Sequence, residues 1–110
     1  MPKAFAQTKY VRISPRKARL AAALIRGIHV QDAMVQLHFS GLKGGALLKK
    51  TLMSAVANAE NLYDVQRRDL KVREVRVDAG PTIKRFKSKC RGRRVPILKR
   101  TSHFLVVVEV

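Results

Sequence analysis

The sequence predicts an α+β domain in which three helices pack on a small, about three-stranded antiparallel sheet with a long protruding β-hairpin. Apolar residues recur at helical spacing up to Tyr63, and after Asp69 the pattern changes to that of strands. The two C-terminal strand patterns enclose a stretch that is strongly basic and poor in apolar residues. This stretch is the predicted hairpin.

The N-terminal region predicts a short strand followed by a helix. Residues 10–13 alternate as a strand does. Ser14 then provides an N-cap, Pro15 suits the first helical position, and Gly27 is the expected stop. The expected apolar side of this helix consists of Ala18, Ala21, Leu24, Ile25 and Ile28. The cations that share the opposite side are Arg16, Arg19 and Arg26.

Two more helices are expected, over residues 30–39 and 42–63. Gly41 separates them, while Gly44 and Gly45 each lower helix stability by about 1 kcal/mol relative to alanine and favour a later start for the second. The inward residues of the shorter helix are Val30, Ala33, Met34 and Leu37. The apolar stripe of the longer helix is Leu48, Leu52, Val56, Ala59 and Tyr63. A polar line along the longer helix faces either solvent or RNA and consists of Lys50, Ser54, Asn58 and Asn61.

The C-terminal third predicts two strands. Leu70 and Val72 are out of phase with Val75 and Val77, which indicates a β-bulge between the pairs or a strand buried on both sides. The apolar run at 104–108 is typical of a central strand. If these strands pair antiparallel, the residues between them form a hairpin with Gly92 near its tip and arms of roughly 30 Å. We therefore expect one domain over residues 1–110, with a globular body at 1–78 and 104–110 and an extended basic hairpin at 79–103.

The charge predicts a polyanionic partner. The chain has 24 Lys and Arg residues against 7 Asp and Glu, a formal net charge of +17, and no acidic residue lies between Ala79 and Val108. Positive charges at this density repel one another, and a phosphate backbone is the usual array that neutralises them. Aromatic residues make up only 5% of the chain, which argues against a surface that stacks several bases.

Other chemistries find little support in the sequence. Cys90 is the only cysteine, so no internal disulfide forms, and the three histidines show no metal-ligand spacing. There is no phosphate-binding loop and no pair of carboxylates spaced to hold Mg²⁺. No signal peptide and no apolar run of about 20 residues is present. We expect a cytoplasmic protein without catalytic residues, metal, cofactor, membrane contact or homo-oligomer.

Several motifs occur in the order and spacing of one known family. They are 11–19 (VRISPRKAR), 24–27 (LIRG), 54–61 (SAVANAEN), 77–78 (VD) with 80–82 (GPT), 84–86 (KRF), 91–93 (RGR) and 99–103 (KRTSH). On these motifs, the chain resembles the large-subunit ribosomal protein twenty-two family of bacterial type over nearly its whole length. The resemblance implies a structural protein that binds several domains of the large-subunit ribosomal RNA, helps to assemble it, and contacts neighbouring ribosomal proteins. The hairpin tip would line the exit tunnel and meet the nascent peptide.

The resemblance also implies two sets of site residues. The RNA-binding set is Arg12, Ser14, Arg16, Lys17, Arg19, Arg26, Lys84, Arg85, Lys87, Lys99, Arg100, Thr101, Ser102 and His103. The tunnel-lining tip is Lys89, Cys90, Arg91, Gly92, Arg93 and Arg94. The alternatives are a free-standing basic regulator that binds DNA or messenger RNA, a small RNA-cleaving enzyme, a protein that binds anionic membrane surfaces, and a solvated basic tail.

Overall fold

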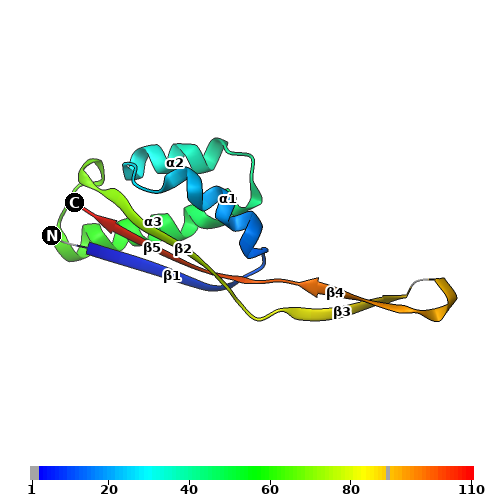
Figure 1. The fold of residues 1–110 in the computed structure, drawn as a ribbon. Helices are drawn as coiled ribbons and strands as arrows, with labels where there is room; N and C mark the ends of the chain where they lie inside the picture. The colour runs from blue at the N-terminus through cyan, green and yellow to red at the C-terminus, as the bar shows by residue number, and fades with distance from the viewer. Residues whose placement is uncertain (1–2, 89) are drawn as a thin grey trace.

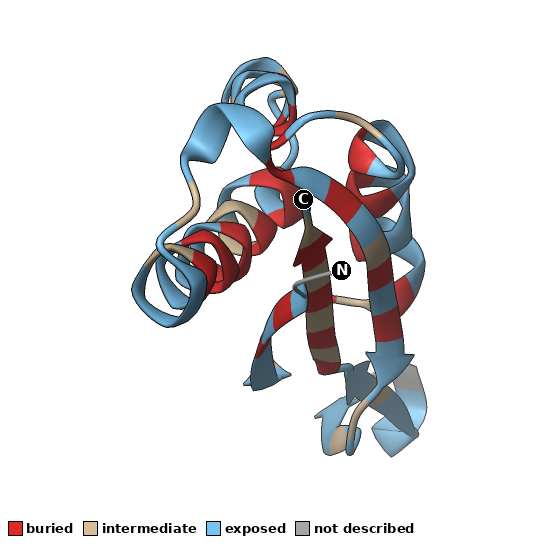
Figure 2. Ribbon diagram, turned by 90° about the vertical axis from the view of Figure 1, so that its left-hand side faces the viewer, coloured by how far each residue is buried: buried red, intermediate tan, exposed pale blue. Residues whose placement is uncertain are grey.

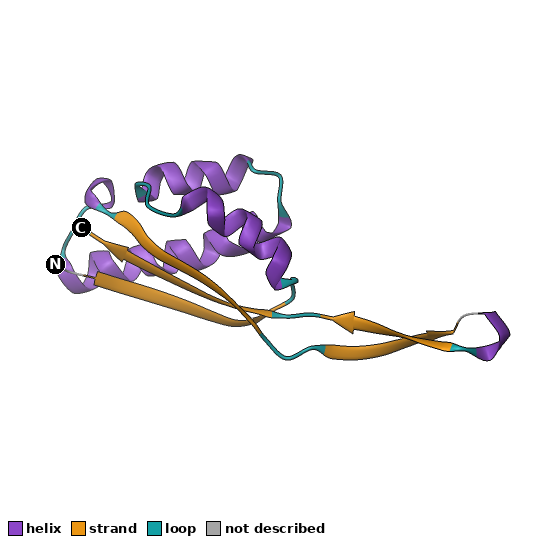
Figure 3. Ribbon diagram, in the orientation of Figure 1, coloured by secondary structure: helices purple, strands orange, loops and turns teal. Residues whose placement is uncertain are grey.

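The computed structural model describes residues 3–88 and 90–110, with only the backbone of Cys90 (Figure 1). The elements in chain order are β1 (Lys3–Val11), α1 (Pro15–Ile25), α2 (Val30–Phe39), α3 (Lys43–Tyr63), η1 (Arg67–Asp69), β2 (Lys71–Ala79), β3 (Ile83–Ser88), η2 (Cys90–Gly92), β4 (Arg94–Lys99) and β5 (Ser102–Glu109). A three-stranded antiparallel sheet has the order β1-β5-β2, and β3 pairs with β4 in a separate ribbon. The helices lie on one face of the sheet (Figure 3), which confirms the predicted α+β class.

The core lies between the helices and the central strand β5. Phe104, Val106 and Val108 are fully buried, while Leu105 and Val107 between them are half-buried on the opposite face. Figure 2 shows this alternation along the sheet. The predicted central strand is confirmed, and its alternation shows that the helices cover only one of its two faces.

Of the two alternatives predicted for β2, the structure shows the β-bulge. The register between β2 and β5 shifts between Val72 and Glu74. The extra residue turns the strand so that Val75 and Val77 are buried in the same core as Val72. Without it, the second half of β2 would direct its valines to solvent.

The N-terminal strand is longer than predicted. β1 begins at Lys3 and ends at Val11, whereas the sequence predicted a strand at 10–13. Ala4 and Ala6 are buried in the core, and alanine is too small to produce a strong strand pattern. The register becomes irregular between Thr8 and Val11, where Tyr10 has a positive φ of 60°.

The observed helix bounds are close to the predicted ones, but some residues that were predicted to face the core are exposed. α2 spans the predicted residues, and α1 ends before Gly27, which has a φ of 78°. Leu24 is 42% exposed, and Ala22 is buried instead, because α1 contacts both α3 and β2 through its small residues. Tyr63, the last residue of α3, is 46% exposed.

The two glycines near the start of α3 allow close packing. A Cβ on Gly44 would lie 3.2 Å from the Cα of Ala18, and one on Gly45 would lie 3.0 Å from the carbonyl oxygen of Leu37. α3 begins at Lys43, one residue after the predicted start and before both glycines. The cost in helix propensity is offset by the close contact with α1 and with the end of α2.

Helix side chains cap both edges of the three-stranded sheet. Arg19 donates from Nε and Nη2 to the carbonyl oxygen of Val77, at 3.2 and 3.1 Å, and Arg26 does the same to Val75 at 3.3 and 3.0 Å. On the other edge, Asn58 Nδ2 donates to the carbonyl oxygen of Phe5 at 2.9 Å. These bonds satisfy edge carbonyls that would otherwise be open to pairing with another strand.

An ion pair at the end of the sheet permits a test by titration. Arg73 Nη1 donates to Glu109 Oε2 at 2.8 Å, and this hydrogen bond lowers the pKa of Glu109. The pair stabilises the fold above the pKa of Glu109 in the unfolded chain, and its contribution is lost as the pH falls through the lower pKa of the folded protein.

We expect the NMR titration midpoint of Glu109 to rise in Arg73→Met. Arg76→Met, which instead removes the partner of Glu74, is the control and should leave the midpoint unchanged; an unchanged midpoint in Arg73→Met would contradict the assignment.

Candidate nucleic-acid interface

The basic hairpin projects from the body as a narrow ribbon, which we call the arm (residues 79–103). β3 and β4 pair from Ile83 opposite Lys99 to Ser88 opposite Arg94. The molecule measures 63 × 24 × 16 Å, and the arm extends along the longest dimension (Figure 1). The arm continues the antiparallel pairing of β2 with β5 beyond the edge of the body.

Cations lie on both faces of the arm. The register places Arg85, Lys87 and Lys99 on one face of the ribbon, and Lys84 and Arg94 on the other, because side chains alternate along each strand. A flat anionic surface would contact only one face at a time. The arrangement is suited to a partner that surrounds the arm with negative charge.

The positive charge of the arm has no internal counterpart. Three ion pairs occur among the described residues, and all of them lie in the body: Arg67–Glu60, Arg73–Glu109 and Arg76–Glu74. The arm itself has no acidic residue. Its cations therefore remain solvated until an external anion neutralises them.

The tip reverses direction at η2, close to the predicted position. Arg91 and Gly92 adopt positive φ values of 62° and 72°. Nearby, the guanidinium carbon of Arg94 lies 4.5 Å from the centre of the Phe86 ring, a cation–π contact that fixes its direction. The predicted tip residue Lys89 and the side chain of Cys90 lie outside the described residues, while Arg93 is exposed.

Three predicted RNA-binding residues anchor the base of the arm. The Thr101 hydroxyl donates to the carbonyl oxygen of Pro81 at 2.6 Å, and the buried Ser102 hydroxyl donates to that of Ile13 at 2.7 Å. His103 Nδ1 accepts from the backbone N–H of Tyr10 at 3.1 Å. These side chains connect the start of β5 and the residue before it to β1, to the chain between β1 and α1, and to the chain leaving β2, so they position the arm.

The predicted helix surface divides into two parts. Arg12, Arg16 and Lys17 are exposed around the start of α1, where their charges are open to solvent. Arg19 and Arg26 instead hydrogen-bond the edge of β2, as described above. The structure therefore gives these two arginines a structural contact that the sequence did not predict.

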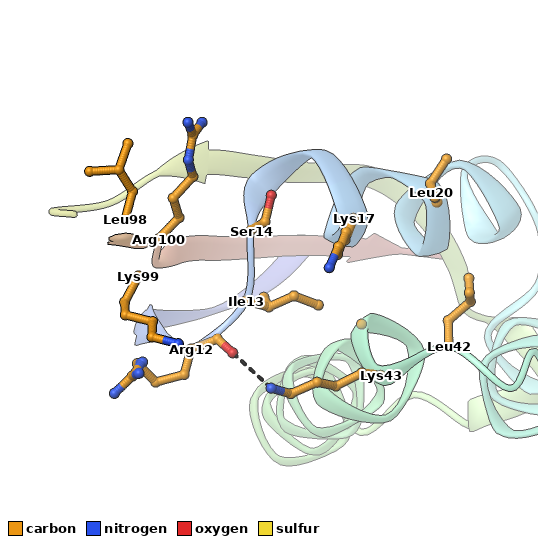
Figure 4. A pocket seen from close by; sticks show the side chains of 11 residues that line it. Arg12, Ile13, Ser14, Lys17, Leu20, Leu42, Lys43, Leu98, Lys99 and Arg100 are labelled. Atoms are coloured by element: carbon orange, nitrogen blue, oxygen red, sulfur yellow. Dashed lines mark hydrogen bonds between the residues drawn. The ribbon is translucent and has the colours of Figure 1, made fainter. Parts of the chain in front are cut away.

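A pocket lies where the arm joins the body, and we call it the root pocket (Figure 4). It has a volume of about 500 Å³. Three segments that are distant in the sequence meet there. The lining residues are Arg12, Ile13, Ser14, Lys17, Leu20, Leu42, Lys43, Gly44, Leu98, Lys99 and Arg100.

The root pocket joins predicted residues to others that sequence reasoning missed. Arg12, Ser14, Lys17, Lys99 and Arg100 were predicted to bind RNA, and they are brought together here from α1 and the arm. The lining residues that were not predicted as site residues are Ile13, Leu20, Leu42, Lys43, Gly44 and Leu98. Lys43 Nζ donates to the carbonyl oxygen of Arg12 at 3.1 Å, which ties the start of α3 to the entry of α1. The only signal for Lys43 was its position before the two glycines that allow this approach.

A candidate metal cluster and a membrane-spanning helix are both absent from the described residues. Within 3–88 and 90–110, no group of three His, Cys, Asp or Glu side chains is placed to hold a metal ion. In the same part of the chain, none of the helices has the length and apolar character needed to cross a bilayer.

The two edge-capping arginines can be tested separately from the arm. We expect Arg19→Met with Arg26→Met to lower the free energy of unfolding by about 1–3 kcal/mol, because two β2 carbonyls lose charged hydrogen-bond donors. RNA affinity should change little under conditions where the variant stays folded. Chemical denaturation measures the first effect. Arg16→Met with Lys17→Met is the control, since neither exposed side chain bonds the sheet; equal stability of the two double variants would contradict the structural role.

A folded body with one slender, acid-free arm and a basic pocket at its base is the arrangement typical of a basic, polyanion-binding protein. The model of the family described as Ribosomal protein L22p/L17e matches residues 6–109. The chain is 70% identical over 108 residues to the large ribosomal subunit protein uL22 of Protochlamydia amoebophila strain UWE25, covering 98% of this chain and 97% of that protein. The proteins of the same name from Chlamydia pneumoniae and Chlamydia trachomatis serovar L2 are 61% and 58% identical over 103 residues, covering 94% of this chain and 93% of each relative. This chain belongs to the L22p/L17e family of ribosomal proteins.

Proposed function

We propose that this chain is a structural constituent of the large ribosomal subunit that binds large-subunit ribosomal RNA and assists its assembly in the cytoplasm. Family membership supports the assignment to the subunit. One observation carries the RNA-binding mechanism: the arm has cations on both faces and no acidic residue. Such an arm gains stability when RNA surrounds it and neutralises its charge, releasing counterions.

The body and arm have different roles in this proposal. Exposed cations of the helix entry and root pocket bind RNA backbone at the surface, while Lys84, Arg85 and Lys87 neutralise phosphates along the arm. The length of the projecting ribbon supports a reach into the interior of the subunit. The tip, from Lys89 to Arg94, lines the exit tunnel and meets the nascent peptide, as the resemblance implies.

The proposed role requires no catalysis, cofactor, metal or self-association. Its partners are ribosomal RNA and neighbouring ribosomal proteins, and the family is one of structural proteins. A test for hidden RNA cleavage is to replace His29, His38, His103 and Cys90 one at a time. If the wild-type protein cleaves RNA and one of these substitutions abolishes the cleavage, the proposal is contradicted.

A free-standing basic regulator of DNA or messenger RNA remains the second candidate. The net charge of +17 would favour binding to ribosomal RNA in a ribosomal protein and binding to DNA or messenger RNA in a regulator. Sedimentation distinguishes them, because a ribosomal constituent travels with the large subunit after a high-salt wash. A regulator would be found in the fractions that contain no ribosomes.

The counterion mechanism predicts a steep dependence of RNA binding on salt. If about eight phosphates are contacted, the plot of log affinity against log salt concentration should have a slope of roughly −6 to −7. Filter binding or fluorescence anisotropy with purified large-subunit ribosomal RNA measures the slope. A slope near zero would exclude charge neutralisation as the main source of affinity.

A further inference from the structure

We propose that the root pocket holds one unpaired nucleotide of the bound RNA, with its base against the apolar wall and its phosphates on the basic rim. This inference rests on the proposed function and names the RNA feature recognised at one site. A paired base is stacked inside its helix and cannot enter a side-chain pocket, so the nucleotide must be turned out of the stack. The volume of about 500 Å³ lies in the range of small-molecule pockets.

The wall of the root pocket is aliphatic and partly uncovered. Leu20 is 61% exposed and Leu98 is 46% exposed, and both lie beside the same pocket as Leu42 and the buried Ile13. Leu20 and Leu42 lie at one end of the pocket, beyond Ile13, and Leu98 lies at the opposite end near Arg100 (Figure 4). A flat base that lies against Ile13, Leu20 and Leu42 would remove the apolar surface at this end of the pocket from water.

The rim of the root pocket is entirely cationic. Its charged lining residues are Arg12, Lys17, Lys43, Lys99 and Arg100, and the lining contains no carboxylate. A nucleotide enters with a phosphate on each side, so cations are needed on opposite sides of the base. The arm supplies two of these cations, the segment around the start of α1 two, and α3 one. The guanidinium groups of Arg12 and Arg100 can also stack on a base or bind phosphate through paired donors.

The start of α1 adds one polar donor at the same place. Ser14 occupies the N-cap position of α1, yet its hydroxyl makes no capping hydrogen bond. The hydroxyl is therefore free to bond a ligand in the pocket that it lines. It would add a directional contact to a site whose other polar groups are long, flexible cations.

An acidic peptide is the competing occupant, because carboxylates would suit the same rim. The surroundings favour RNA. The pocket lies between the arm and the exposed cations of α1, and no acidic residue occurs in residues 79–108 or before Asp32. An RNA strand that follows this surface passes the pocket while keeping its phosphates on cations on either side.

The test fills the root pocket without removing a cation. Leu20→Trp places an indole in the space, and Leu24→Trp is the matched control, because Leu24 is exposed on the same helix but does not line the pocket. Purified large-subunit ribosomal RNA is bound to each full-length protein and probed with reagents that modify unpaired bases. We expect wild type and Leu24→Trp to protect one unpaired base that Leu20→Trp leaves reactive. Loss of this contact should weaken binding about tenfold while leaving the salt slope unchanged.

Three outcomes would overturn the inference. If Leu20→Trp gives the same base protection as wild type, the pocket holds no base, although RNA binding by the arm stands. If wild type itself fails to bind the RNA, the proposed function fails as well. A photo-crosslinker at position 20, tested in assembled large subunits, provides the second measurement: a crosslink to a nucleotide supports the inference, and one confined to an acidic protein segment overturns it.

Discussion

Deleting residues 83–99 and joining Thr82 to Arg100 through one glycine is expected to abolish tight RNA binding while the body stays folded. The deletion removes eight Lys and Arg residues. On the counterion-release scale, the loss of this many phosphate contacts lowers affinity by about a thousandfold or more at physiological salt. No residue from 83 to 99 that the structure describes belongs to the buried core, so the body loses none of its packing.

The body should stay folded because the deletion leaves the strand pairing at the base of the arm intact. Gly80 N–H donates to the carbonyl oxygen of Thr101 at 2.9 Å, and Ala79 pairs with Ser102 just before it. Joining the strands beyond this pair makes a short hairpin loop, which has a smaller closure entropy than the long arm. Circular dichroism and thermal unfolding measure the fold, and anisotropy measures RNA affinity.

A second variant separates the charge of the arm from its shape. Replacing the same eight cations with glutamine keeps the arm length and removes the charge. We expect this variant to lose nearly as much affinity as the deletion, because the mechanism is electrostatic. If it binds RNA as tightly as wild type, shape rather than charge recognises the RNA. If the deletion unfolds the body, the arm is part of the core.

The general fold could be predicted from the sequence because its signals are local. The phase change between Val72 and Val75 indicated the bulge, and the apolar run at 104–108 identified the central strand. The acid-free stretch between these strands then had to project, since its ends were fixed by strand pairing. Each inference needed only residues close together in the chain and the known period of a strand.

The features that the sequence missed depend on contacts between distant segments. The N-terminal strand is held by Ala4 and Ala6, whose small side chains carry little β propensity. The carbonyls that Arg19 and Arg26 cap belong to β2, more than forty residues away. The root pocket likewise requires Lys43 beside Arg12, a contact made possible by the close approach of α1 and α3 at Gly44. A periodic pattern within one segment carries no information about such contacts between distant segments.

Replacing Phe104 with alanine is expected to lower the free energy of unfolding by about 3–5 kcal/mol. Phe104 is fully buried, and it pairs with Thr8 on one side and Val77 on the other at the end of β5 nearest the arm. A domain of this size is stable by about 5–15 kcal/mol in total, so the substitution removes a large part of that stability. Denaturant unfolding measures the loss.

Phe86→Ala is the matched control for the core substitution. Phe86 is 57% exposed on the arm and contacts Arg94 rather than the core. We expect it to leave the free energy of unfolding nearly unchanged, since little buried surface is lost. Similar stability of the two variants would contradict the position of Phe104 in the core. A large loss in Phe104→Ala alone would show that the body is held by its own packing, and that Phe86 on the arm contributes little to the stability of the body.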